Sequence, residues 1–261
     1  MRPLDIRINK LNIPVLNEWK RGISELDLKH RTKSNIYVTF KALLNWAVQN
    51  EYLPNNPLAK VPNFRDAYEN KKELRYYTPE EYLRYASSAW SIAAEIGFYD
   101  YYVFFAIAYY TGARKGEIHA LRWTDLRNGS IHITKSITQK LRGDDRETPP
   151  KNKSSNRVVQ LPEPLIDILK DHKKRGKAYK GFNDNYYICG GIRPLRDSTL
   201  SKMNFKIADE AGLHHIRIHD FRHSHASLLA NNGVNILEIS RRLGHSNIEQ
   251  TLNTYSHFYP Q

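Results

Sequence analysis

The chemically reactive side chains of this chain concentrate near its carboxyl end. Seven of the eleven histidines lie between residues 214 and 257, together with several arginines. The segment His219-Asp220-Phe221-Arg222 is the most informative, because residues three apart on a helix share a face and would project together. A guanidinium can donate two parallel hydrogen bonds to the non-bridging oxygens of a phosphodiester. The segment therefore predicts a phosphate-binding face, although a histidine and an arginine on an ordinary surface helix would give the same short pattern.

Three further segments accompany this one. The sequence TGARKGE occupies residues 111–117, LGHS occupies residues 243–246, and Tyr255 follows. Ile248, Leu252 and Tyr255 have the i, i+4, i+7 spacing of an apolar helical stripe. From the residues alone, Tyr255 is either a packed aromatic or a reactive phenol.

Taken together, Arg114, His219-x-x-Arg222, His245 and a tyrosine ten residues later resemble the tyrosine recombinase (phage integrase) family. The sequence is most similar to integrases of phages and conjugative transposons from Gram-positive bacteria, in the segments "TGARKGEI", "HDFRHSHASLL" and "LGHSNIEQTLNTYSHFYP". The resemblance extends from about residue 75 to the end, with the motifs in the family's order. A weaker amino-terminal resemblance is to the family's helical core-binding domain.

This resemblance implies a site-specific DNA recombinase (integrase) that serves the integration and excision of a mobile element. Tyr255 would attack a DNA phosphodiester, form a 3′-phosphotyrosyl bond and release a 5′-hydroxyl, without a metal, nucleotide or other cofactor. An unperturbed phenol has a pKa of about 10, so neighbouring groups must activate it. Tyr259 is a rival nucleophile, but it lies outside the motif and Pro260 would end its helix.

The resemblance also implies roles for the other motif residues. Arg114 and Arg222 would hold the scissile phosphate, and Glu117 would orient Arg114 from one helical turn away. His219 would accept or share the proton of the nucleophile. His245 would donate a hydrogen bond to the phosphate.

A lysine on a hairpin is expected to protonate the departing 5′ oxygen. The family pattern Pro-Lys-Thr-x-Ser-Ser-x-Arg resembles residues 150–157, PKNKSSNR. This alignment makes Lys151 the general acid. Lys153 is the alternative, because Asn152 replaces the usual threonine and the hairpin register is open.

The histidine cluster could instead indicate a metal-dependent nuclease or hydrolase. His219 and His225 would lie about 600° apart on a helix, so with His223 they do not share one face. No acidic pair is spaced to complete a site for a hard metal ion. We therefore expect no metal site; His223 and His225 receive no role, and His225 is expected to be a core histidine.

Charge supports a polyanionic partner. The chain has 261 residues with 40 basic and 27 acidic side chains, a formal net charge of +13 and a pI near 9.6, which favours nucleic acid. The longest apolar runs are about half of what a bilayer crossing needs, so a membrane span is not expected, and no secretory signal is recognisable. Cys189 is the only cysteine, which excludes a disulfide within the chain. The family resemblance implies that this partner is double-stranded DNA at attachment or terminal-repeat sites. The resemblance also implies a homo-oligomer, a tetramer on DNA. Its expected location is the bacterial cytoplasm, associated with the nucleoid and not with a membrane.

The elements that position the motif residues are predicted to be mostly helices. Periodicity and caps predict an apolar helix that ends at Thr111-Gly112, a helix opened by a Thr78/Glu81 capping box, and helices at about residues 163–175, 198–211, 219–231, 235–243 and 247–256. Residues 131–137 and 157–161 are predicted to form one antiparallel strand pair. The expected fold class is mainly α (α+β): a helical core-binding domain plus a mostly helical catalytic domain with a small antiparallel β-sheet.

A polar stretch, residues 62–77, is expected to link two domains. Residues 1–67 form the predicted DNA-clamping core-binding domain, truncated at its amino terminus, and residues 68–261 form the predicted catalytic domain. The first domain carries eleven Lys/Arg against six acids, which favours phosphate contacts. Its long helix is predicted to bury one stripe, made of Ile36, Phe40, Leu43, Leu44 and Ala47.

Two other functions share part of this pattern. A catalytically silent, integrase-like DNA-binding regulator would keep the basic charge but would not cleave DNA, and the complete residue set argues against it. A type IB topoisomerase shares the chemistry but would only relax supercoils.

Overall fold

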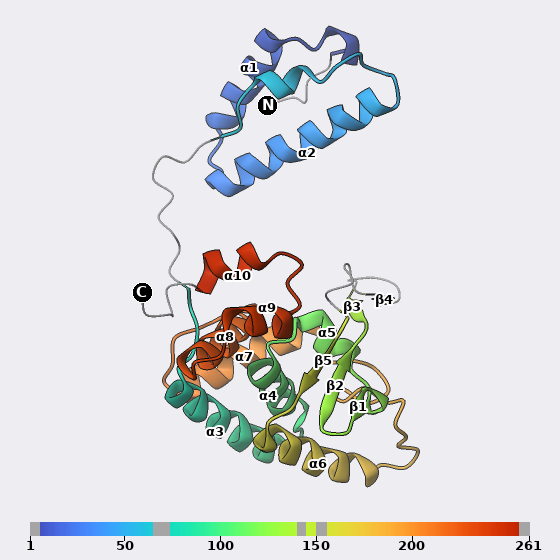
Figure 1. Cartoon of the computed structure of the whole chain (residues 1–261), viewed down its shortest axis with the longest axis vertical. Helices are drawn as coiled ribbons and strands as arrows, with labels where there is room; N and C mark the ends of the chain where they lie inside the picture. Colours follow the sequence, from blue (N-terminus) through green and yellow to red (C-terminus); the bar gives the residue numbers. More distant parts are fainter. Residues whose placement is uncertain (1–5, 65–73, 140–144, 150–155, 256–261) are drawn as a thin grey trace. The chain divides into compact units, whose positions relative to one another are not determined.

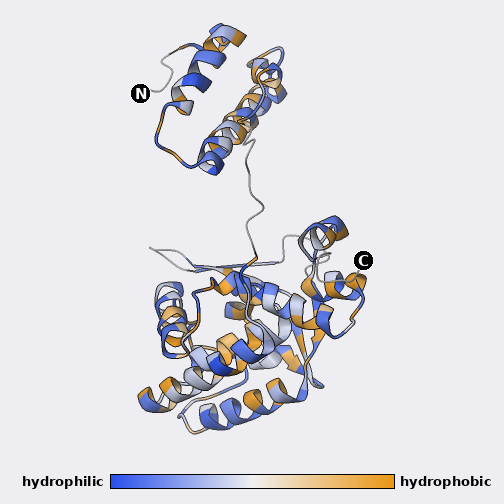
Figure 2. Cartoon of the chain, turned by 90° about the vertical axis from the view of Figure 1, so that its left-hand side faces the viewer, coloured by the Kyte–Doolittle hydropathy of each residue, from blue (hydrophilic) through white to orange (hydrophobic). Residues whose placement is uncertain are grey.

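The structure, a computed structural model, describes residues 6–64, 74–139, 145–149 and 156–255. The chain divides into two compact units, Met1–Lys72 and Glu73–Gln261 (Figure 1). The predicted domain boundary after residue 67 lies outside the described residues. Orange and blue segments alternate around the helices of both units, as expected for amphipathic helices (Figure 2).

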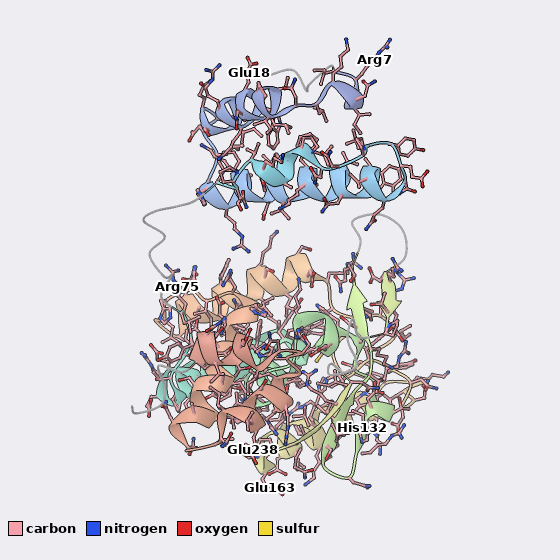
Figure 3. All side chains as sticks on the ribbon, turned by 45° about the horizontal axis from the view of Figure 1, so that its top comes forward. Arg7, Glu18, Arg75, His132, Glu163 and Glu238 are labelled. Carbon is pink, nitrogen blue, oxygen red and sulfur yellow. The ribbon has the colours of Figure 1, made fainter. Side chains whose placement is uncertain are left out.

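The first unit is built on two helices, α1 (Ile13–Ser24) and α2 (His30–Gln49), with short 3-10 turns at Ile8–Lys10 and Pro57–Lys60. Its polar and charged side chains, including the labelled Arg7 and Glu18, project outward (Figure 3). The core forms where Tyr37, Leu44 and Ala47 of α2 pack with Leu16 and Leu58. The Tyr37 hydroxyl also donates to the carbonyls of Leu58 and Val61, which fixes the chain after α2.

The buried stripe of α2 differs from the predicted one. Leu43 is 55% exposed, whereas Tyr37 is buried and Val48 packs against the core. The stripe therefore runs through Tyr37, Phe40, Leu44 and Ala47, rotated from the predicted line. The rotation follows from Tyr37, whose ring is apolar enough to bury while its hydroxyl finds backbone acceptors.

The second unit packs its helices around a nearly all-apolar one. These helices are α3 (Pro79–Ile96), α4 (Asp100–Thr111), α5 (Lys115–Ala120), α6 (Glu163–Lys177), α7 (Asp197–Glu210), α8 (Phe221–Asn231), α9 (Ile236–Leu243) and α10 (Ile248–Tyr255). The residues of α4 from Val103 to Tyr109 are all buried, so it is the centre of the core. The predicted capping box at the start of α3 is present in both directions. The predicted helix positions are confirmed to within two residues, except that His219 lies in a 3-10 turn, Ile218–Asp220, just before α8.

The strands form two small antiparallel sheets. One has the order β1 (Leu126–Arg127), β2 (Ser130–Ile133), β5 (Arg157–Gln160), and the other pairs β3 (Ser136–Thr138) with β4 (Arg146–Thr148). Ile131 opposes Val159, as the predicted strand pair requires. The prediction of one continuous strand over residues 131–137 is wrong, because Ile137 instead opposes Glu147 on β4. The fold class, mainly helical with a small antiparallel sheet, is confirmed.

No helix in the described part of the chain is both long enough and apolar enough to cross a membrane.

Candidate active site

Arg114 begins the site at a sharp turn after α4. Gly112 ends α4 with φ +63°, a conformation that glycine adopts at little cost. The chain then enters α5, where the Arg114 backbone N–H donates to Glu117 Oε2 at 2.8 Å and its Nη1 donates to Glu117 Oε1 at 3.0 Å. The Arg114 side chain is still 38% exposed, so part of its guanidinium faces outward.

Glu117 is a buried carboxylate held by two arginines. Arg157, the first residue of β5, donates Nη1 to Oε1 at 3.0 Å and Nη2 to Oε2 at 2.8 Å. Burial raises the pKa of Glu117, but the hydrogen bonds and charges of Arg157 and Arg114 outweigh it and lower the pKa overall. Glu117 is therefore ionised at neutral pH and fixes both guanidinium groups. Sequence reasoning gave Arg157 no role, although it closes the PKNKSSNR segment.

Arg222 is a buried cation bonded to backbone carbonyls. It is 3% exposed, and it donates Nη1 to Gly112 O at 2.8 Å and Nη2 to Leu243 O at 2.7 Å. Burial, followed by the positive charges of Arg114 and Arg157, lowers the pKa of Arg222 to about 9. The charges of Arg114 and Arg157 thus both act on the Arg222 guanidinium, and the single charge of Glu117 opposes them. An anion bound beside Arg114 and Arg222 would relieve this repulsion.

Two histidines share the field of these arginines. Burial and then the charge of Arg222 lower the pKa of His219. Burial and then the charges of Arg222 and Arg114 lower the pKa of His245 to about 3. His245 follows Gly244, whose carbonyl accepts from Arg114 Nη2 at 3.3 Å, and its Nδ1 lies 2.7 Å from Thr251 Oγ1. Both imidazoles are therefore neutral at pH 7 and can act as hydrogen-bonding groups.

Tyr255 closes α10 inside a small apolar cluster. It shares this buried cluster with Ala226 and Ala230 of α8 and Ile239 and Leu243 of α9, and the residue is 1% exposed. Burial raises the pKa of the Tyr255 hydroxyl to about 12, while the nearby charge of Arg222 acts in the opposite direction. The residue is thus both a packed aromatic and a phenol within the field of Arg222.

The histidines that received no role differ in their surroundings. His223 Nδ1 lies 2.7 Å from the Tyr255 hydroxyl, a contact that sequence reasoning missed. Only the position of His223 next to Arg222 could have signalled it. His225 is buried in the core, as expected, and its Nε2 accepts from Arg242 Nε at 3.0 Å.

The alternative lysines, Lys151 and Lys153, lie outside the described residues, as does the rival nucleophile Tyr259. Among the described residues, no group of three or more His, Cys, Asp or Glu is arranged to hold a metal ion.

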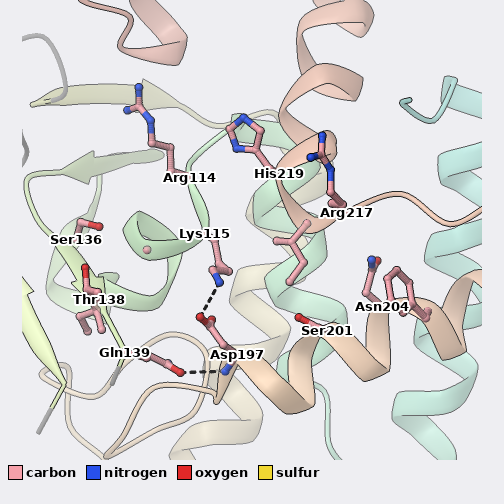
Figure 4. Close-up of a pocket in the computed structure, with 14 residues that line it drawn as sticks. Arg114, Lys115, Ser136, Thr138, Gln139, Asp197, Ser201, Asn204, Arg217 and His219 are labelled. Atoms are coloured by element: carbon pink, nitrogen blue, oxygen red, sulfur yellow. Dashed lines mark hydrogen bonds and ion pairs between the residues drawn. The ribbon is translucent and has the colours of Figure 1, made fainter. Parts of the chain in front are cut away.

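A cavity of about 590 Å³ opens beside the arginines. Arg114, His219 and Arg217 lie along one side of it in Figure 4, and β3 and α7 form other walls. Below them, Asp197 Oδ2 accepts a hydrogen bond from Lys115 Nζ at 2.6 Å, and Asp197 Oδ1 lies 2.8 Å from His119 Nε2. Arg217 is 78% exposed, although it also binds the buried Asp220. The rim is therefore cationic next to Arg114.

Comparison with known proteins identifies the family. The model of the phage integrase family matches residues 86–261, about two thirds of the chain. The chain belongs to the phage integrase family. This confirms the family expected from the motifs. The chain is 28% identical over 261 residues to the ICEBs1 integrase of Bacillus subtilis (strain 168), covering 97% of this chain and 68% of that protein. It is 30% identical over 247 residues to a tyrosine recombinase XerC-like protein of Caldanaerobacter subterraneus subsp. tengcongensis, covering 85% of this chain but only 61% of that protein.

Solved structures share the fold of this integrase family member. The Tn1549 transposon integrase in complex with a circular intermediate DNA aligns with a TM-score of 0.76 at 22% identity, over 97% of this chain and 82% of that one. A lambda integrase dimer bound to a COC′ core site aligns with a TM-score of 0.65 at 16% identity, over 97% of this chain and 82% of that one.

Proposed function

We propose that this integrase family member is a site-specific tyrosine recombinase that breaks and rejoins DNA strands to integrate and excise a mobile element. One observation carries the proposal. Arg114, Arg222 and Tyr255 come from distant segments, and yet all three meet at the end of α9. The adjacent carbonyls of Leu243 and Gly244 accept hydrogen bonds from Arg222 and Arg114, and Leu243 belongs to the same buried cluster as Tyr255. The relatives named integrase and recombinase support the same chemistry.

In the proposed reaction, the scissile phosphate binds to the outward part of Arg114 and to Arg222. The negative charge of the phosphate relieves the repulsion between these guanidinium groups. Their N–H donors also stabilise the extra negative charge of the pentacoordinate transition state. Preorganised donors of this kind contribute about 3–4 kcal/mol each to lowering the barrier. Glu117 supports the step by fixing Arg114 through its two short hydrogen bonds.

Tyr255 is the proposed nucleophile. Its oxygen bonds to phosphorus as the bond to the 5′ oxygen breaks, and this gives a 3′-phosphotyrosyl link and a 5′-hydroxyl. Lys151, or alternatively Lys153, is proposed to protonate the leaving oxygen. His219 is proposed to share the nucleophile's proton, and the neutral His245 to donate a hydrogen bond to the phosphate.

The buried phenol sets a requirement on this reaction. Tyr255 is 1% exposed, so its oxygen has to move outward, or its cover has to move away, before a DNA phosphate can reach it. We propose that DNA binding moves the cover away and leaves the phenol oxygen in place.

The domain roles and partners follow from the same proposal. Residues 1–67 would clamp duplex DNA through their basic surface, and residues 68–261 would carry the chemistry. The partner would be double-stranded attachment or terminal-repeat DNA, with a homotetramer as the active assembly. The protein would work where bacterial chromosomal DNA lies, in the cytoplasm and on the nucleoid.

A nicked suicide substrate carrying a candidate attachment site tests the proposal. The wild-type chain is expected to become covalently joined to radiolabelled DNA, and Tyr255→Phe is expected to abolish the adduct. Tyr179→Phe, at a residue that is 71% exposed, is the matched control and should behave as wild type. An undiminished adduct in Tyr255→Phe would exclude Tyr255 as nucleophile, and DNA binding without any cleavage would indicate a regulator. Recombination between two marked DNA sites separates the recombinase from a topoisomerase, which would only relax supercoils.

A further inference from the structure

His223 lies at the centre of a row of three rings. Its ring centroid lies 5.6 Å from that of His219 on one side and 5.6 Å from that of Tyr255 on the other. Its Nδ1 atom lies 2.7 Å from the Tyr255 hydroxyl. The imidazole that touches the phenol oxygen is therefore that of His223, whereas the family resemblance points to His219.

The direction of this hydrogen bond follows from the protonation states. Burial, followed by the proximity of His219, lowers the pKa of His223 to about 4, so the ring is neutral at pH 7. Burial keeps Tyr255 protonated, and a phenol is a strong donor. A neutral imidazole with its proton on Nε2 presents a free lone pair at Nδ1. The Tyr255 hydroxyl accordingly donates to His223 Nδ1.

The neighbours of His223 connect this contact to the phosphate-binding side. Arg222 precedes it on α8 and is fixed by the Gly112 and Leu243 carbonyls. Leu243 and Tyr255 belong to the same buried cluster, which residues of α8 and α9 complete, so these two helices position both the guanidinium and the phenol. Consecutive helical residues project about 100° apart, which lets one short segment hold both groups at once.

We propose that His223 is a further catalytic residue, whose Nδ1 accepts the hydrogen bond of the Tyr255 hydroxyl and holds the phenol oxygen in register with Arg222 for attack on the phosphate. The inference rests on the proposed function, because it takes Tyr255 as the nucleophile. A misplacement of about 1 Å at a reacting atom can cost roughly a hundredfold in rate.

Three substitutions at this position separate the hydrogen bond from other roles of the imidazole. In His223→Asn the side-chain Oδ1 falls near the place of Nδ1 and can still accept the bond. In His223→Gln the Oε1 falls instead near the place of Nε2, and His223→Ala has no acceptor. His214→Ala removes a half-exposed imidazole from the same unit and serves as the control.

The measurement is the single-turnover rate of covalent complex formation on a nicked suicide half-site, together with the Kd for that DNA. We expect His223→Ala and His223→Gln to be slower by roughly a hundredfold at unchanged Kd, and His223→Asn to stay within about tenfold of wild type. A wild-type or faster rate in His223→Ala would overturn the proposal, and a faster rate would show that the contact restrains Tyr255. An equal loss in His223→Asn and His223→Ala would also overturn it. Retention of the adduct in Tyr255→Phe would instead refute the proposed function, so the two failures are distinguishable.

Discussion

At the scale of single residues, the site is organised by one buried carboxylate among several guanidinium groups. Glu117 accepts four hydrogen bonds, two from Arg157 and two from Arg114. These hydrogen bonds fix the orientation of Arg114. The site stays positively charged, because one carboxylate does not neutralise several guanidinium groups. A buried charge of this kind is stable only while its partners are present, because each partner left alone would be an uncompensated ion.

Replacement of Glu117 should therefore destabilise the second unit. Glu117→Gln is expected to lower the free energy of unfolding at pH 7 by about 3–5 kcal/mol, measured by urea denaturation, because Arg157 loses its charged partner inside the protein. Glu95→Gln, at an exposed position of α3, should change it by less than about 0.5 kcal/mol.

The pH dependence of that difference has a definite sign. Folding lowers the pKa of Glu117, so its contribution is fully present above the unfolded-state pKa of about 4.5. The gap between wild type and Glu117→Gln should shrink as pH falls below about 4.5, through the folded-state pKa. A gap that widens on acidification would contradict this account.

At the scale of elements, the turn between α4 and α5 joins the core to the site. The Gly112 carbonyl accepts from Arg222, and the turn delivers Arg114 to the start of α5. A Cβ atom on Gly112 would lie 2.7 Å from Leu243 Cδ2 and 2.8 Å from His225 Cδ2, so the close packing there requires glycine.

Gly97 provides the matched comparison for this turn, because it has nearly the same φ, +67°, but no atom within 4 Å of an added Cβ. Gly97→Ala should lower the free energy of unfolding by about 1–2 kcal/mol through the backbone alone. Gly112→Ala should cost a further 1–3 kcal/mol, roughly, because Leu243 and His225 must move. Equal losses in the two variants by urea denaturation would show that the contact with α8 and α9 carries no energy.

Most of the elements could be predicted from the sequence, since caps and apolar periodicity are local signals. The capping box at Thr78 and the glycine end of α4 are clear cases. The break between β2 and β3 could not be predicted, because Ile137 suits a continued strand as well as a new one. Its pairing with Glu147 on β4 assigns it to the separate strand β3. The family motifs supplied the predicted site residues, which remain predictions. The contacts that Arg157 makes with Glu117 and His223 makes with Tyr255 join distant segments, and spacing does not show them.

At the scale of the whole molecule, the net charge of +13 is the property that bears on DNA affinity. Each phosphate contact releases bound counterions from the duplex, so added salt weakens binding. For each contact, log Kd rises by roughly 0.9 when the salt concentration rises tenfold. The basic side chains of residues 1–67 are the expected source of many of these contacts.

A steep salt dependence is accordingly expected for duplex binding by the whole chain, with a slope magnitude of about 5 or more in a plot of log Kd against log salt concentration. The double variant Arg21→Gln/Arg31→Gln, at exposed positions of the first unit, should reduce the slope by up to about 2. Lys170→Gln on α6 is the control in the second unit. A nearly flat dependence of log Kd on log salt concentration for the wild type would contradict the proposed DNA-clamping role of residues 1–67.

In the proposed reaction, two guanidinium groups and one phenol act on a single phosphorus atom. The most direct test of this reaction is mass spectrometry of the covalent protein–DNA complex after protease and nuclease digestion. We expect a nucleotide attached through its 3′ phosphate to the side chain of Tyr255. A nucleotide on Tyr259, on any other residue, or attached through a 5′ phosphate would contradict it.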